Sequence, residues 1–260
     1  MAQLSDDCFA FGGPLLSVEE AVALMQERLP VLAEAEWAAL AEADGRIAAE
    51  DVRAGLDLPP FSNSAVDGYA VRHGDLAPAG DTTLPVAGRI AAGQSPEGAV
   101  AAAAIRIFTG APMPPGADTV FMQEDVRLEG GRVVLPPGLK AGANRRLAGE
   151  DAARGEVIIP AGRRLRPQDL ALAAAVGLQR LPVRRRLRVA LFSTGNELTE
   201  PGAPLRPGAV HDSNRVMRRA LLGRLGVEVR DLGVLPDEVE VVAGQIQAAA
   251  AGADLVLTSG

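Results

Sequence analysis

The clearest pattern of apolar and polar residues lies in the last third of the chain, where short apolar runs alternate with apolar positions at helical spacing. A short apolar run rich in Val, Leu and Phe, residues 187–192, stops at Ser-Thr-Gly, which predicts a buried strand. Apolar positions at helical spacing over 214–225, closed by Gly226, predict a helix after it. The alternation continues with a predicted strand at 227–229, a helix at 238–251 and a strand at 254–258. Such alternation predicts a parallel α/β sheet, and ligands of such sheets bind beyond the carboxyl ends of the strands.

The composition and the apolar pattern change over residues 56–149, where Pro and Gly are frequent and helical periodicity is absent. Short strands and a hairpin turn at 129–132 are predicted there, which indicates a separate β-rich domain. The strands are expected at 84–87, 105–108, 119–122 and 132–135. Nearer the start, Ser17-Val-Glu-Glu20 has the form of a capping box that opens a helix.

The expected fold class is therefore α/β plus β: a parallel α/β domain, incomplete at its C-terminus, with a separate β-rich domain before it. The expected domains are a flexible lead-in at 1–16, a linking helical and mixed domain at 17–55 and 150–182, a β-rich domain at 56–149, and the α/β domain at 183–260.

Composition narrows the class of function. The 260 residues exceed the usual size of one domain, and 48% are apolar, which is enough for proper cores. The net charge of −7 and the aromatic content of 3% argue against a nucleic-acid partner. A single cysteine, Cys8, excludes an internal disulfide framework. With no apolar run near membrane-spanning length and no signal peptide, a cytoplasmic protein without a membrane partner is expected.

Polar residues follow the first predicted strand of the α/β part. Ser193, Thr194 and Gly195 form a candidate phosphate-binding turn through backbone N–H groups and two hydroxyls. The turn lacks both the P-loop ending and the G-x-G-x-x-G fingerprint. About sixteen residues rich in Pro and Gly separate it from the next helix, as a lid or as a surface excursion.

Two carboxylates are expected at the same edge of the sheet, because both follow strand ends. Glu197 comes just after the first strand, and Asp237 follows the second at the start of a helix, where helix capping is an alternative role. Together they could hold Mg²⁺, which takes one or two acids plus substrate phosphates. His73 and His211 are interpreted as ordinary loop residues, and the basic run at 184–188 as a solvated entry to the strand.

Two further stretches carry candidate chemistry, each with a plain structural alternative. Residues 60–71 contain Asp67 and Gly68, which suit a tight turn with Asp67 bonding its own backbone and Gly68 taking positive φ. Thr109 lies between a strand and a proline-stiffened loop, a setting as typical of plain β connections as of sites. The acids before Gly155, ending at Asp151, suit a solvated turn.

Five motifs in order nevertheless resemble the molybdopterin molybdenumtransferase family, of the MoeA and gephyrin E-domain type. They are Asn63-Ser-Ala-Val-Asp-Gly-Tyr-Ala70, Ile107-Phe-Thr-Gly-Ala-Pro112, Gly142-Ala-Asn-Arg145 with Gly149-Glu-Asp151, Ser193-Thr-Gly-Asn-Glu-Leu198, and Asp212-Ser-Asn214. Val66 replaces a methionine common in the first motif, and Asn196 replaces a frequent aspartate.

The resemblance implies an enzyme that inserts molybdenum from molybdate into adenylylated molybdopterin and releases AMP, with Mg²⁺ taking part. It also implies a homodimer whose active site joins the α/β domain of one subunit to the β-rich domain of the other, with the molybdopterin adenylyltransferase as a candidate partner. The implied functional positions are Asp67, Thr109, Asp151, Glu197 and Asp237, with Glu197 and Asp237 at the metal and Ser193, Thr194, Gly195 and Asn214 at the cofactor. Because the family continues beyond this point into more of the sheet and a β-barrel domain, a C-terminally truncated chain is expected.

Two other functions stay open at this stage. A pterin- or nucleotide-binding module, like the related adenylyltransferase domains, would not need the β-rich domain that carries Asp67. A dimeric scaffold would tolerate replacement of Glu197 and Asp237.

Overall fold

The computed structural model describes residues 16–96 and 98–259, so that all of the expected lead-in except Leu16 lies outside the described residues. The chain divides into two compact units. One unit is Ala35–Arg184, and the other combines Met1–Glu34 with Arg185–Gly260. The finer domain boundaries expected from the sequence stay predictions.

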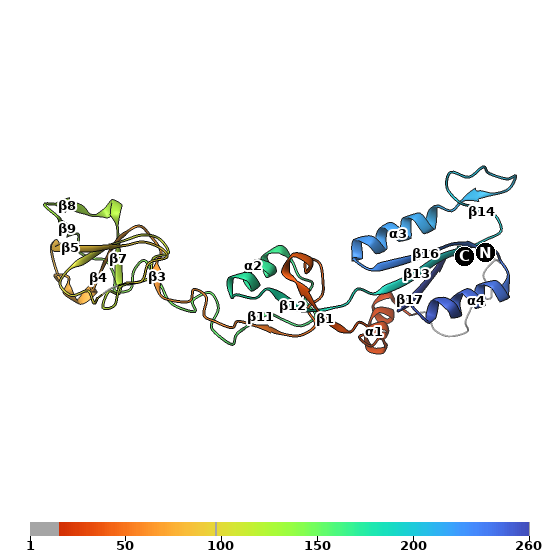
Figure 1. Ribbon diagram of the computed structural model, residues 1–260, viewed down its shortest axis with the longest axis horizontal. Helices are drawn as coiled ribbons and strands as arrows, with labels where there is room; N and C mark the ends of the chain where they lie inside the picture. Colours follow the sequence, from red (N-terminus) through yellow and green to blue (C-terminus); the bar gives the residue numbers. More distant parts are fainter. Residues whose placement is uncertain (1–15, 97, 260) are drawn as a thin grey trace. The chain divides into compact units, whose positions relative to one another are not determined.

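A three-stranded parallel sheet forms the centre of the second of these units, as the alternating pattern predicts. Strand β13 (Arg188–Thr194) lies between β16 (Glu228–Leu235) and β17 (Leu255–Ser259). Helices α3 (Ser213–Leu225) and α4 (Val239–Ala250) connect the strands (Figure 1). The α/β fold class is confirmed.

The sheet and α3 share a small apolar core. Val189, Leu191 and Leu222 are buried together, with Val227 and Leu257 packed against them. The helix is bounded as its sequence predicts. The side chain of Asp212 accepts the N–H of Arg215 at the start, and Gly226 adopts φ 76° at the end.

Strand β16 contains an irregularity before it reaches the sheet's edge. Its register with β13 shifts between the pairs made by Leu191 and Ser193, and Gly233 adopts φ 77° there. The N–H of Gly233 donates to Asp231 Oδ1 over 3.0 Å, which fixes the local bend. The residues after it, 234–237, are thereby set at the carboxyl edge of the sheet.

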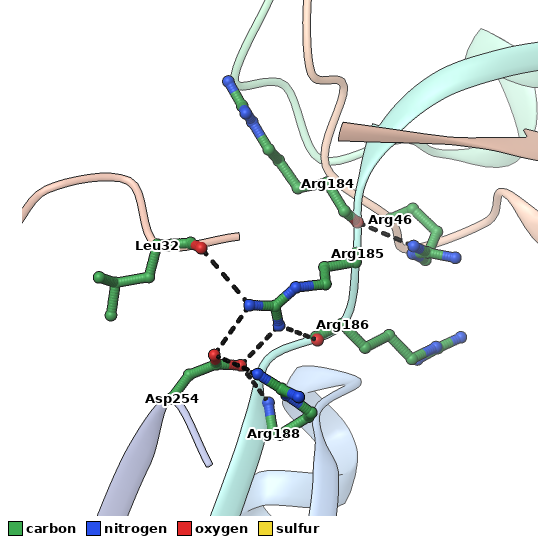
Figure 2. Close-up of polar contacts among 7 residues, drawn as sticks. All are labelled: Leu32, Arg46, Arg184, Arg185, Arg186, Arg188 and Asp254. Carbon is green, nitrogen blue, oxygen red and sulfur yellow. Dashed lines mark hydrogen bonds and ion pairs between the residues drawn. The ribbon is translucent and has the colours of Figure 1, made fainter. Parts of the chain in front are cut away.

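Asp254 fixes the amino end of the same sheet (Figure 2). Arg185 donates to both of its oxygens, over 2.6 and 2.8 Å, and also to the carbonyl oxygen of Leu32 over 3.5 Å. The backbone N–H of Arg188 adds a bond of 2.8 Å. Hydrogen bonds from Arg185 and Arg188 hold the pKa of Asp254 well below its usual range. The expectation that this basic run is merely solvated is therefore wrong for these two arginines.

A single helix opens the described chain. Helix α1 (Val18–Arg28) begins with the predicted capping box: the N–H of Ser17 donates to Glu20 over 2.8 Å, and the N–H of Glu20 donates to the Ser17 hydroxyl over 3.2 Å. In the described part of the chain, no helix is long and apolar enough to cross a membrane.

Part of the unit Ala35–Arg184 combines short strands and helices around a shared apolar core. Its elements are β1 (Ala35–Ala39) paired with β12 (Arg180–Arg184), β2 (Val52–Arg53) paired with β11 (Val157–Ile159), the 3-10 turn η1 (Leu40–Glu42) and helix α2 (Pro167–Ala175). Ile159, Leu165, Leu181 and Val183 form the buried centre.

The same unit contains a six-stranded sheet in the order β7-β4-β6-β5-β9-β8 (Figure 1). The strands are β4 (Gly68–Val71), β5 (Thr82–Ile90), β6 (Ala104–Ile107), β7 (Thr119–Met122), β8 (Arg127–Glu129) and β9 (Arg132–Leu135). A further short ladder joins β3 (Asn63–Ser64) to β10 (Arg145–Arg146). The predicted strands at 84–87, 105–108, 119–122 and 132–135 all lie at these positions, and the predicted hairpin joins β8 to β9.

Strand β4 departs from the sequence-based expectation of a tight turn. Gly68 begins this strand and pairs with Met122 and Ile107, and it does not have positive φ. A Cβ atom on Gly68 would lie 1.8 Å from the carbonyl oxygen of Phe121. Glycine is needed at this position because the neighbouring backbone is too close for a side chain, rather than because of a turn.

Candidate functional site

The turn after β13 and the segment after β16 are joined at the carboxyl edge of the parallel sheet, hereafter the rim. The backbone N–H of Asn196 donates to Asp237 Oδ2 over 3.4 Å, and the N–H of Asp237 donates to Asn196 Oδ1 over 3.3 Å. Asp237 is exposed, and so is Glu197, the residue after Asn196. The two carboxylates predicted for this edge therefore lie on segments that contact each other.

Gly195 makes the close turn that leads to Glu197. Its φ is 154°, and a Cβ atom on it would lie 2.7 and 2.9 Å from the two carboxylate oxygens of Glu197. The same atom would lie 2.9 Å from Leu198 Cγ. The Glu197 carboxylate thus folds back over the bare face of Gly195, and a side chain there would displace it.

Ser193 and Thr194 lie inside strand β13 rather than in an exposed turn. Ser193 pairs with Val234 and Ser259 and is fully buried, whereas Thr194 is partly exposed. Of the three residues of the predicted phosphate-binding turn, Thr194 is partly exposed and Gly195 lines the cavity described below, whereas Ser193 is enclosed in the sheet.

A cavity of about 440 Å³ opens at the rim. Its lining combines the turn after β13, the loop that follows and the end of β16: Gly195, Asn196, Leu198, Glu200, Arg206, Val234, Leu235 and Pro236. It is the size of a small-molecule site and lies at the edge where parallel sheets bind ligands.

The long loop between β13 and α3 is folded rather than free. Strand β14 (Leu198–Thr199) pairs in parallel with β15 (Val210–His211), and the N–H of Val210 donates to the Glu197 carbonyl over 2.9 Å. Farther out, Arg206 Nη2 donates to the carbonyl oxygen of Asn196 over 2.9 Å. These contacts argue against a mobile lid. They favour the second alternative, a surface segment, which here forms a fixed wall beside the cavity.

Arg215 anchors this wall from inside. Its side chain is 8% exposed and reaches three carboxylates. Nε donates to Asp212 over 2.9 Å, Nη1 donates to Asp231 over 2.6 Å, and Nη2 donates to Glu200. One guanidinium therefore connects the start of α3, the bend in β16 and the loop that lines the cavity.

The charges of this cluster stabilise one another. Burial lowers the pKa of Arg215, but hydrogen bonds to its carboxylate partners outweigh burial and raise the pKa above its ordinary value. Burial likewise raises the pKa of Asp212, but hydrogen bonds from the backbone N–H and the side chain of Arg215 hold the pKa below its usual range. The ion pairs of Arg215 with Asp212, Asp231 and Glu200 fix the geometry around the cavity.

A second candidate group, in the β-rich sheet, joins Asp67 to Thr109. The backbone N–H and the hydroxyl of Thr109 both donate to Asp67 Oδ1, each over 2.8 Å. The hydrogen bonds from Thr109 hold the pKa of Asp67 below its ordinary value, with a smaller contribution from the charge of Arg106. Both residues are at least partly exposed to solvent. The alternative in which Asp67 bonds its own backbone is wrong, because its recorded partner is 42 residues away.

Sequence reasoning missed the arginines that surround this pair. Arg106 donates to the carbonyl oxygen of Gly68 over 3.2 Å and to Gln123, and its guanidinium lies 4.8 Å from the centre of the Phe108 ring. Arg89 lies 4.6 Å from the same ring. Their positions on β6 and β5 become informative only once the two strands are known to pair side by side.

Within the described residues, no hydrogen bond or ion pair joins Asp151 or Asn214 to these groups. Asp151 forms an ion pair with Arg146, and its N–H donates to the carbonyl oxygen of Leu58 over 2.8 Å. Asn214 is exposed in the first turn of α3. Within 16–96 and 98–259, no group of three or more His, Cys, Asp or Glu side chains could hold a metal ion by itself.

Comparison with known proteins agrees with the motifs. Residues 16–177 match the family described as "MoeA N-terminal region (domain I and II)", and residues 190–260 match the "Probable molybdopterin binding domain". The molybdopterin molybdenumtransferase of Haemophilus influenzae is 42% identical over 248 residues, which cover 95% of this chain and 61% of that protein. The molybdopterin molybdenumtransferase of a Nostoc species is 38% identical over 254 residues, or 95% of this chain and 58% of that protein.

Solved structures agree as well. The crystal structure of the molybdopterin biosynthesis MoeA protein from Pyrococcus horikoshii OT3 matches with a TM-score of 0.88 and 34% identity, over 95% of this chain and 67% of that one. A second MoeA structure from Pyrococcus horikoshii gives a TM-score of 0.81 at 33% identity, over 95% of this chain and 64% of that one.

The fold and the rim define a protein with a molybdopterin-binding type of α/β domain joined to a β-rich part. The chain belongs to the MoeA family. It spans about 60% of the length of the curated relatives named above.

Proposed function

We propose that this protein acts in molybdenum cofactor biosynthesis, inserting molybdenum from molybdate into adenylylated molybdopterin and releasing AMP. The observation that carries the proposal is the contact between Asn196 and Asp237, which brings the Glu197 turn and Asp237 to one rim in a chain of the MoeA family. Relatives named molybdopterin molybdenumtransferase support the same reaction.

The donor set at the rim fits Mg²⁺. This ion prefers oxygen ligands and is usually held by one or two carboxylates together with substrate phosphates, so a pair of acids is sufficient. Glu197 is exposed, and Asp237 uses one carboxylate oxygen toward Asn196, while its other oxygen has no hydrogen-bond partner among residues 16–96 and 98–259. We propose that these two carboxylates hold Mg²⁺, which would polarise the phosphoanhydride when bound.

The protein's own groups would orient the substrates. Gly195 and Asn196 border the cavity where an adenylyl phosphate would bind, and Thr194 directly precedes them. The Asp67 carboxylate is kept ionised by Thr109, so it can accept hydrogen bonds from a substrate at neutral pH. Asp151, Ser193 and Asn214 remain in the proposed functional set on the resemblance alone.

The test is molybdate-dependent AMP release from adenylylated molybdopterin in the presence of Mg²⁺, with this 260-residue chain. Glu197→Gln keeps the size of the side chain and removes its charge, so release should fall at least about tenfold if the carboxylate holds the metal. Glu228→Gln is the matched control, because Glu228 is also exposed but begins β16 at the opposite end of the sheet.

Three outcomes distinguish the alternatives. Release that depends on Glu197 and not on Glu228 supports the proposal. Binding of the adenylate without turnover would favour the binding module instead. Equal activity in both variants would remove Glu197 from the site and favour a different metal position or a scaffold role.

We also propose, on the resemblance, that the protein is a cytoplasmic homodimer whose candidate partner is the molybdopterin adenylyltransferase. Sedimentation equilibrium measures the dimer directly. A mass equal to one chain of 26.9 kDa at micromolar concentration would contradict it.

A further inference from the structure

We propose that Arg206, on the wall formed by residues 196–211, is an oxyanion-binding residue of the rim cavity. The ligand class is a tetrahedral oxyanion, supplied either by the phosphate of the adenylyl group or by molybdate. The inference rests on the proposed function and names a residue that neither the motifs nor the comparisons point to.

The wall is rigid enough to present a side chain in a fixed place. Its base is closed by the β14–β15 ladder and by a bond of 3.0 Å from the N–H of Asp212 to the carbonyl oxygen of Thr199. Directly after β14, Glu200 forms an ion pair with the buried Arg215. Turn bonds from Ala203 to Glu200 over 3.1 Å and from Ala209 to Arg206 over 3.0 Å order the tip. A residue on such a frame loses little entropy when it binds a ligand.

Arg206 has donors left for a ligand. A guanidinium carries five N–H donors, and the recorded bond to the Asn196 carbonyl uses one of Nη2. For the part of the chain that the structure describes, no other partner of Arg206 is recorded. The Asn196 bond fixes one edge of the guanidinium plane at the cavity and leaves the rest of the fork available for an oxyanion.

The charge around the cavity also calls for a cation. Glu197 and Asp237 at the rim are acidic, and Glu200 in the lining is already paired with Arg215. Arg206 contributes the single positive charge among the residues that line the cavity within the described chain. An oxyanion near these carboxylates would be repelled without a nearby positive charge, which Arg206 supplies beside any divalent ion.

The experiment measures binding by isothermal titration calorimetry with the whole 260-residue chain, in Mg²⁺, with AMP in one arm and molybdate in the other. Arg206→Ala should weaken the affinity for at least one probe by about tenfold, as expected when a charge-assisted hydrogen bond to an oxyanion is lost. Arg206→Lys keeps the positive charge but loses the forked guanidinium, so its affinity should lie between those of the wild type and Arg206→Ala. Arg224→Ala, an exposed arginine in the last turn of α3, is the control with the same change in net charge.

The arms separate the two sources of the oxyanion. A loss confined to AMP assigns Arg206 to the adenylyl phosphate, and a loss confined to molybdate assigns it to the metal oxyanion. Wild-type binding that Arg206→Ala leaves unchanged, with the urea unfolding midpoint also unchanged, overturns the inference and leaves the proposed function intact. Failure of the wild-type chain to bind either probe, together with absence of AMP release, overturns both.

Discussion

Thr109 gives both of its donors to one oxygen of Asp67, each across 2.8 Å. The backbone N–H and the hydroxyl thereby stabilise the ionised form, and no described residue donates to the second carboxylate oxygen. The pair joins the loop before β4 to the end of β6, so two segments of the chain set one charge.

The first prediction concerns the titration of this carboxylate. Because the pKa of Asp67 is lowered in the folded protein, its hydrogen bonds stabilise the fold above the ordinary aspartate pKa, and that contribution is lost as the pH falls through the lowered pKa. Thr109→Val removes the hydroxyl and keeps the N–H, so the pKa should rise part of the way to its ordinary value. Carboxyl-carbon NMR measures this directly, and Thr109→Ser should titrate like the wild type. An unchanged pKa in Thr109→Val would contradict the role of the hydroxyl.

The second prediction tests the close approach at Gly68. Gly68→Ala places a Cβ atom 1.8 Å from the Phe121 carbonyl oxygen, so the strands must separate. We expect a loss of about 3 kcal/mol or more in the free energy of unfolding by urea. Gly88→Ala, in the same sheet, would place its Cβ in ordinary contact at 3.5 Å from Ile105 and should change the free energy by less than about 1 kcal/mol. Equal effects of the two substitutions would show that the backbone can yield.

A third prediction separates stability from function at the rim. Gly195→Ala would drive a methyl group into the Glu197 carboxylate, so Mg²⁺-dependent AMP release should fall by at least about tenfold. Gly202, on the loop that follows, has φ 91°, but no atom of the described residues lies within 4 Å of the methyl group that Gly202→Ala adds. This substitution should cost about 1 kcal/mol of stability and leave the release rate unchanged. If both variants lost the same activity, backbone strain rather than displacement of Glu197 would be responsible.

The fourth prediction concerns the buried arginine. Arg215→Ala leaves Asp212, which is 2% exposed, without its cation, so we expect destabilisation of about 3–5 kcal/mol. Arg219→Ala is the control. The Arg219 side chain also pairs with Asp231, a partner of Arg215, but it is 65% exposed and its Nη1 lies 3.6 Å from the carboxylate. Its removal should cost at most about 1 kcal/mol. Thermal or urea unfolding compares the two, and similar losses would contradict the role assigned to burial.

The α/β part could be predicted well from the sequence because local signals mark its limits. Asp212 and Gly226 bound α3, and the apolar run of β13 ends at Phe192, two residues before the strand ends at Thr194. The six-stranded sheet was harder to predict from the sequence. Strand β4 has only four residues, and the requirement for Gly68 comes from Phe121, which is far away in the sequence.

The candidate site divides in the same way. Glu197 and Asp237 could be assigned to one edge because both follow strand ends, a relation that the alternating pattern contains. Arg215 was missed because its partners Asp231 and Glu200 come from other elements, although the three-residue spacing from Asp212 was a usable signal. Arg206 was missed because only the folded loop brings it to the cavity.

The bonds around Asp254 also impose an order on biosynthesis. The central strand β13 has both of its sheet neighbours later in the chain, and Asp254, which binds Arg185 and Arg188, directly precedes the second of them, β17. The carbonyl of Leu32, from the start of the chain, joins the same cluster. During translation, the segment around Leu32 must wait for the whole of Ala35–Arg184 and then for residue 254 to leave the ribosome before this unit can close. The intervening unit can complete its own sheets first, so the two units are finished in the reverse of the order in which their first residues are synthesised.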